Sequence, residues 1–246
     1  MNPPNIPSNP LPVHITPTAL PPLADDAGIG LLIDSLLKRP ARLIRQLCET
    51  KSSRHWLLLL LVAVPAFALY GLVIGSFHGG GQYYVSPMKV TAGALLSMLI
   101  CFPSFYIFSC LAGIDVQLRG IAGVMFAMFA LTGMLLLGLA PVAWVFSQST
   151  TSENFIAILH LVFWLIAAAF GARLLSYMTQ AQDVPHRVHL RVWLVIFILV
   201  SLQMTTALRP IIGPSADWLP KEKRFFLTYW YENILPDAQK GHRGSD

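Results

Sequence analysis

Five long apolar segments dominate the sequence and restrict what it can fold into. They lie at residues 56–77, 90–114, 120–146, 155–178 and 190–208, and none of them contains Asp, Glu or Lys. At a rise of 1.5 Å per residue, about 20 residues cross the roughly 30 Å hydrocarbon core of a bilayer. Each segment is about this long or longer. We therefore predict five transmembrane helices.

The composition excludes the soluble classes of protein. Only 12% of the residues are charged and 55% are hydrophobic, whereas about 25% of a soluble domain is charged. The connections between the apolar segments are short, which favours contact between consecutive helices. The predicted fold is all-α: a polytopic membrane protein with a compact antiparallel bundle of five transmembrane helices, in which neighbours in sequence are neighbours in space.

Segments of different character flank the predicted bundle. Residues 1–27 are rich in proline, which predicts a disordered cytoplasmic tail. Residues 28–50 repeat Leu and Ile every three or four positions opposite basic residues, as amphipathic interfacial helices do, and Pro40 predicts a break near Arg39. Residues 215–235 alternate aromatic and basic side chains, which predicts another interfacial helix, and residues 236–246 form a flexible polar tail.

The distribution of basic residues predicts the orientation. Cytoplasmic flanks of membrane helices carry an excess of Lys and Arg. Six basic residues precede the first span, and further ones follow on the same side at Arg119, Arg187 and Arg191, against Lys89 on the other side. The N-terminus is therefore predicted to be cytoplasmic and the C-terminus outside. Basic residues after the last span, such as Arg209, argue against this orientation.

Small and polar residues within the spans are the candidate contacts between helices. The candidates are Gly71 and Gly75 on the first span, His160 on the fourth, and Gln203, Thr205 and Thr206 on the fifth. Small residues allow close approach of helices, including those of a homo-oligomer, and polar side chains form interhelical hydrogen bonds. A central His can also ligate a haem or relay a proton. No second central His is present in the spans, so we predict a hydrogen-bonded His160 and no cofactor or metal.

No recognisable catalytic motif is present. The only candidate catalytic group is Asp183 with His186 and His189 in the last predicted loop. An enzyme that acts on lipid would need such a group of a base and its partners. Solvated charges are expected in such a basic loop, so we predict that the protein is not an enzyme. The basic residues border apolar segments, which favours contact with the lipid bilayer over binding of nucleic acid.

The order of these segments resembles the Yip1 family of five-span membrane proteins, which includes bacterial relatives. The likeness in layout covers the whole chain. The likeness in the pattern of residue types covers residues 31–77, where the sequence LLKRPARLIRQL precedes the apolar sequence WLLLLLVAVPAFALYGLVIG. The resemblance implies a non-enzymatic protein that acts through partners in the membrane. We place it in the inner membrane of a bacterium.

Two functions remain open from the sequence. The first is a scaffold, accessory or trafficking-type factor that binds other membrane proteins. The alternative is a small oligomeric transporter or channel. A transporter usually needs an ionisable or carbonyl-lined site at membrane depth. The predicted spans contain no acidic residue, which favours the first function.

Overall fold

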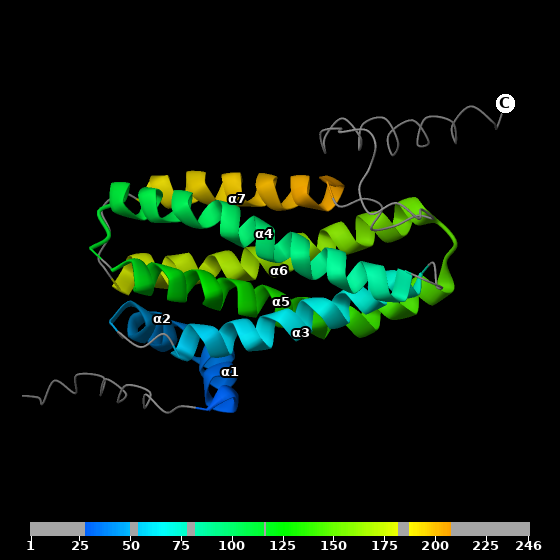
Figure 1. Ribbon diagram of the computed structural model, residues 1–246, viewed down its shortest axis with the longest axis horizontal. Coiled ribbons are helices and arrows are strands. Elements are labelled where there is room, and N and C mark those ends of the chain that lie inside the picture. The colour runs from blue at the N-terminus through cyan, green and yellow to red at the C-terminus, as the bar shows by residue number, and fades with distance from the viewer. Residues whose placement is uncertain (1–27, 50–53, 78–81, 116, 182–186, 208–246) are drawn as a thin grey trace, which may run out of the picture.

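The described part of the chain is helical throughout (Figure 1). The computed structural model describes residues 28–49, 54–77, 82–115, 117–181 and 187–207. Within these residues the helices are α1 (Ile29–Lys38), α2 (Pro40–Glu49), α3 (Arg54–Ser76), α4 (Gln82–Leu111), α5 (Leu118–Ser149), α6 (Glu153–Ala181) and α7 (Arg187–Ala207). The all-α prediction is therefore confirmed for the described residues. The predicted tail at 1–27, the aromatic helix at 215–235 and the tail at 236–246 lie outside them.

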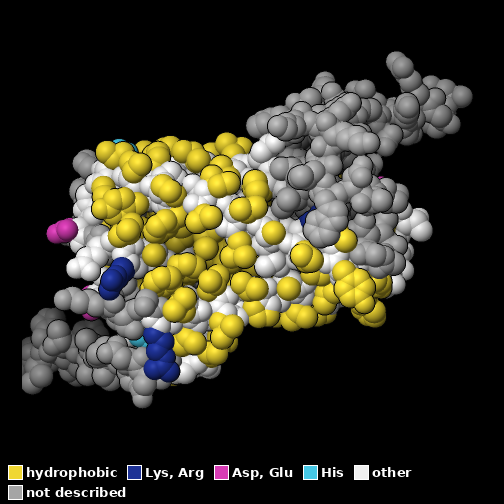
Figure 2. Space-filling model, viewed as in Figure 1, with side chains coloured by type: hydrophobic (Ala, Val, Ile, Leu, Met, Phe, Trp, Pro, Cys, Tyr) yellow, Lys and Arg dark blue, Asp and Glu magenta, His cyan; other side chains and the backbone are white. Residues whose placement is uncertain are grey.

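Four helices are long and apolar enough to cross a membrane. They are α3, α4 from Tyr83, α5, and α6 up to Gln180. Helix α7 contains a shorter apolar stretch, Val188–Met204. Hydrophobic side chains cover the middle of the surface, and the two most prominent basic side chains lie near its left-hand end, as Figure 2 shows. Such a band is typical of a surface that faces lipid. The described residues thus have the helices expected of an integral membrane protein.

Helix α4 begins earlier than the sequence pattern indicates. The second span was expected to start at residue 90, but the helix starts at Gln82. The polar residues that precede residue 90 look like a loop in the sequence. In the structure they continue the helix because Ser86 is buried and the backbone of Pro87 packs against α3. Lys89 therefore lies about two helical turns inside α4 instead of in a connecting loop.

Helices α1 and α2 pack their apolar faces onto the bundle. Helix α1 ends at Lys38 and Pro40 opens α2, where proline is accommodated because the first helical residues need no N–H donor. Helix α2 contacts both α5 and α6. Leu47 of α2 lies so close to α5 that a Cβ atom on Gly123 would be 3.2 Å from the Leu47 Cβ. The two short helices thus form part of the folded core.

The remaining helices are arranged around α3 and α5 (Figure 1). Helix α3 packs on α4 and α5, and α5 packs on α3 and α6. Helix α7 packs on α4, whereas it touches α6, its neighbour in sequence, at few positions. The expectation that neighbours in sequence are neighbours in space therefore does not hold for α6 and α7. The physical reason is Trp193, whose side chain is completely buried against α4.

Candidate functional site

The glycine face of α3 is occupied by another helix of the same chain. A Cβ atom on Gly71 would lie 2.6 Å from the Cα of Pro87 and 3.1 Å from the carbonyl oxygen of Ser86. Only a residue without a side chain permits this approach between α3 and α4. Gly75, one turn further along α3, is also buried. Gly71 is therefore a contact within the bundle and does not form an open surface for a partner.

Two further glycines bring helices together in the same way. A Cβ atom on Gly133 of α5 would lie 3.1 Å from the Phe67 ring of α3. One on Gly171 of α6 would lie 2.5 Å from the Thr132 hydroxyl oxygen of α5. Gly138 differs, because it is exposed on α5 and no atom of another residue lies within 4 Å of its Cβ position. Most of these small residues thus serve the packing of this chain on itself.

His160 forms an interhelical hydrogen bond with Tyr70. The Tyr70 hydroxyl oxygen lies 2.8 Å from His160 Nδ1, and the two rings meet edge to face with centroids 5.5 Å apart. Both side chains are buried. Within the described residues, His160 Nε2 is buried and has no hydrogen-bond partner. A neutral imidazole that accepts the Tyr70 proton at Nδ1 carries its own proton on Nε2. This pair links α3 to α6.

Replacing Tyr70 by Phe should destabilise the protein modestly. Interhelical hydrogen bonds in membrane proteins contribute about 0.6 kcal/mol on average, and a newly unpaired buried group adds to the loss. We expect a decrease of about 1–2 kcal/mol in the free energy of unfolding, measured by SDS titration in mixed micelles. Tyr84→Phe, at an 80% exposed position, is the matched control. Equal stability of the two variants would mean that the Tyr70–His160 bond contributes nothing.

The buried side of α4 is polar in its first half. Ser86, Lys89 and Ser97 are each at most 4% exposed. Their spacing places them on one side of the helix. Further along, the buried residues Cys101 and Phe105 are apolar. We call Ser86, Lys89 and Ser97 the polar face of α4.

The polar face is only partly satisfied by the protein itself. The Ser97 hydroxyl donates to the carbonyl oxygen of Gly93 at 2.8 Å. No described carboxylate forms an ion pair with Lys89. A buried ammonium group in a membrane is stabilised by a negative or polar group beside it, so this face has the capacity to interact with such a group.

Trp193, which is not among the candidates from the sequence, connects α7 to α4. Trp193 Nε1 donates to the carbonyl oxygen of Cys101 at 3.3 Å and to the Ser104 hydroxyl oxygen at 3.2 Å. The ring also packs on Phe105, with centroids 4.3 Å apart. A tryptophan near the end of an apolar segment usually indicates a residue at the membrane interface. The sequence therefore gave no reason to expect a core residue here.

The other predicted site residues are not brought together. Gln203 is half-buried on α7 and has an interaction partner, while the side chains of Thr205 and Thr206 lie outside the described residues. Asp183 and His186 are outside them as well, and His189 is half-buried in α7. The described residues contain no group of three or more His, Cys, Asp or Glu that could hold a metal ion.

Cys48 of α2 is a poor nucleophile. Burial, followed by the neighbouring Glu49 carboxylate, raises the pKa of the Cys48 thiol to about 11. The thiol is therefore protonated at neutral pH, and the thiolate is the reactive form. This residue acts as an apolar packing group between α2 and the bundle.

Comparisons with known proteins give no further assignment. No protein-family model, no curated protein and no solved structure matches the chain at a significant level. The similarity to the Yip1 family stays a prediction from the order of the segments.

Proposed function

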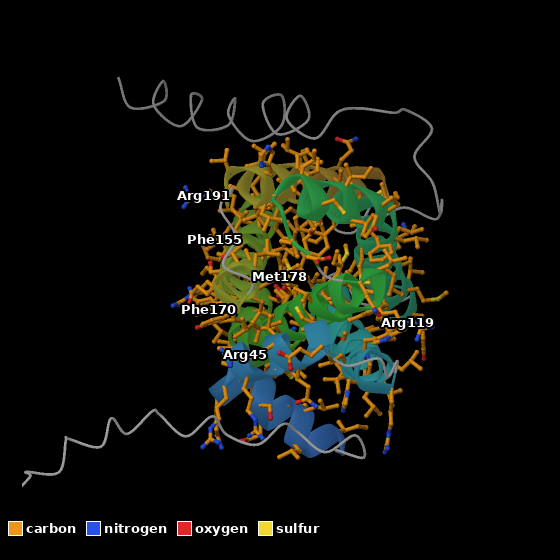
Figure 3. All side chains as sticks on the ribbon, turned by 90° about the vertical axis from the view of Figure 1, so that its left-hand side faces the viewer. Arg45, Arg119, Phe155, Phe170, Met178 and Arg191 are labelled. Carbon is orange, nitrogen blue, oxygen red and sulfur yellow. The ribbon has the colours of Figure 1, made fainter. Side chains whose placement is uncertain are left out.

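We propose that the protein crosses the inner membrane of a bacterium five times as an antiparallel bundle, with its N-terminus cytoplasmic and its C-terminus outside. The four long apolar helices and the shorter apolar α7 support five spans. Arg45 is on α2, and Arg119 and Arg191 lie near the starts of α5 and α7, all at the left-hand end of the bundle in Figure 1, the end that Figure 3 views. This grouping supports a cytoplasmic location for that end.

Labelling of single cysteines tests this topology. In a background without native cysteines, Ser8→Cys, Tyr84→Cys and Ser245→Cys are expected to report different sides. An impermeant thiol reagent on intact cells should label positions 84 and 245 and spare position 8, because only the first lies in the cytoplasm. Tyr84 is chosen because it is 80% exposed, whereas nearby Ser86 is buried. Equal labelling of positions 8 and 245 would contradict an odd number of spans.

We propose that the protein conducts or transports a small anion through the bundle. The observation that carries this proposal is the polar face of α4, on which the Lys89 side chain is only 4% exposed although it lies within a candidate span. Lys and Arg side chains select anions in membrane pores. A bundle that served only as a contact surface would be expected to bury an apolar side chain at this position, since a charged side chain within a span is costly.

This proposal changes the order of the two functions that the sequence left open. The scaffold was favoured because the predicted spans contain no acidic residue. The observed start of α4 adds no acidic residue, but it brings an ionisable one, Lys89, into a candidate span. The small residues were candidate contacts between helices, and Gly71, Gly133 and Gly171 make such contacts inside the chain. The support for the scaffold function is therefore weaker.

Anion flux into sealed liposomes tests the transport function. Purified protein should accelerate the entry of chloride or nitrate into vesicles. Lys89→Met should lower the rate at least about tenfold, the factor that corresponds to about 1.4 kcal/mol of lost stabilisation. Arg119→Met, which removes an exposed charge from α5, is the matched control and should retain the flux. Wild-type protein that moves neither anion would contradict the proposal.

Binding to another membrane protein is the second candidate function. The specific observation in its favour is Gly138, which is exposed on α5 with open space around its Cβ position. Another helix could approach closely at such a position. If the purified protein moves neither anion into liposomes, binding to another membrane protein or to a second copy of this chain is the better explanation.

A further inference from the structure

Three arginines from different helices lie on one side of the bundle. Arg45 belongs to α2, Arg173 to α6 and Arg191 to α7, and all three are exposed. Figure 3 shows Arg45, Arg191 and Phe170 on the same side and Arg119 on the opposite side. The Arg173 guanidinium carbon lies 5.7 Å from the centre of the Phe170 ring, which places this group on the same side.

The three positive charges are not neutralised by the described residues. The ion pair between Lys38 and Asp34 lies on α1. Among the described carboxylates, none pairs with Arg45, Arg173 or Arg191. The guanidinium groups of α2, α6 and α7 therefore present a net positive surface on this side of the bundle, which attracts negatively charged groups.

The surface around these arginines is apolar. On α6, Ile166 and Phe170 are 43% and 46% exposed, and on α7, Val192 and Val195 are 47% and 57% exposed. Helices α6 and α7 touch at few positions, so both present these side chains outward. A ligand that matches this surface has a negative head and apolar chains. A water-soluble anion would satisfy the arginines alone.

The depths of the arginines fit a phosphate at the membrane interface. Arg191 is four residues from the start of α7 and Arg173 is eight residues from the end of α6. These separations correspond to about 6 Å and 12 Å along the helices. Long arginine side chains extend from such depths toward the headgroups. Arg45 is on α2, which packs against α6 at this end.

We propose that the surface formed by Arg45, Arg173 and Arg191 binds the phosphate headgroups of anionic phospholipids in the adjoining leaflet. The acyl chains lie along the exposed faces of α6 and α7. Anionic headgroups bind basic surfaces between membrane helices on the cytoplasmic side, and each arginine near the membrane surface contributes to this attraction. This lipid site lies on the outside of the bundle and does not depend on transport through the polar face of α4.

Native mass spectrometry with added lipid tests the site. Purified full-length protein is titrated with phosphatidylglycerol or with phosphatidylcholine, which is zwitterionic. Wild-type protein should retain phosphatidylglycerol preferentially. The double variant Arg45→Gln/Arg191→Gln should bind it about 30-fold more weakly. Arg173→Gln alone should weaken binding about fivefold.

A matched control separates a specific site from general charge attraction. Arg54→Gln/Arg119→Gln removes the same net charge from exposed positions on α3 and α5 and should leave the preference intact. Arg45→Lys/Arg191→Lys keeps the charge and should retain most of the binding. The proposal would be overturned if Arg45→Gln/Arg191→Gln and Arg54→Gln/Arg119→Gln weakened the binding of phosphatidylglycerol equally. A wild-type protein that does not prefer phosphatidylglycerol would overturn it as well. If a double variant is not monodisperse, the single variants are compared instead. Arg173→Gln should then bind phosphatidylglycerol more weakly than Arg119→Gln, and equal binding would overturn the proposal.

Discussion

Gly71→Leu is expected to prevent stable folding of the protein. A Cβ atom at this position would lie 2.6 Å from the Pro87 Cα, and a backbone atom cannot move aside as a flexible side chain can. Relief of the clash requires α3 and α4 to separate, which breaks their packing along the bundle. We expect a loss of at least about 3 kcal/mol, at the upper end of the range for overpacked cores. SDS titration of the purified protein measures this loss.

Gly138→Leu provides the matched control for this substitution. It makes the same chemical change at a glycine with open space around its Cβ position. Its effect on the free energy of unfolding should stay within about 0.5 kcal/mol. If Gly71→Leu is as stable as Gly138→Leu, the close contact between α3 and α4 does not exist in the membrane.

Trp193→Ala should be comparably severe, for a different reason. It removes a fully buried ring that packs on Phe105 and donates hydrogen bonds to Cys101 and Ser104 of α4. Truncation of a buried Trp to Ala typically costs about 3–5 kcal/mol. Because α7 has few contacts with α6, its attachment depends mainly on its packing against α4, in which Trp193 is completely buried. The free energy of unfolding measured by SDS titration is expected to fall by that amount.

Two variants separate the contributions of Trp193. Trp193→Phe keeps an aromatic ring but removes the Nε1 donor, so it should cost about 1–2 kcal/mol. Trp144→Ala removes a tryptophan that is 51% exposed on α5 and should change stability little. A Trp193→Ala protein as stable as Trp144→Ala would show that α7 is held in another way.

The sequence was sufficient to predict helices but not all of their ends. Long apolar runs can only satisfy their backbone groups as helices in lipid, which is why the segments at 56–77 and 120–146 correspond to α3 and α5. The start of α4 differed because Gln82, Ser86 and Lys89 are polar. The helical conformation here depends on the packing of Ser86 and Pro87 against α3, a tertiary effect that local hydrophobicity does not register.

The candidate site could be predicted only in part for a similar reason. Residue type and spacing identified Gly71 and His160 as residues suited to contacts between helices. Spacing along one helix gives the face on which a residue lies, but it does not identify the helix opposite. Whether Gly71 meets α4 or a second protein, and whether His160 meets Tyr70, depends on the arrangement of the bundle. Trp193 was missed because its position resembled that of an interfacial anchor.

The attachment of α7 to α4 implies a waiting period during synthesis of the protein. Ser104 and its partner Trp193 are 89 residues apart in the chain. At about 5–20 residues per second, α4 exists for roughly 5–20 s before α7 has been made. During that time the Ser104 hydroxyl can donate to the carbonyl oxygen of Cys101, at 2.8 Å, within α4 itself. Helix α7 thus packs onto a helix in which the Ser104 hydroxyl can already be hydrogen-bonded before Trp193 is made.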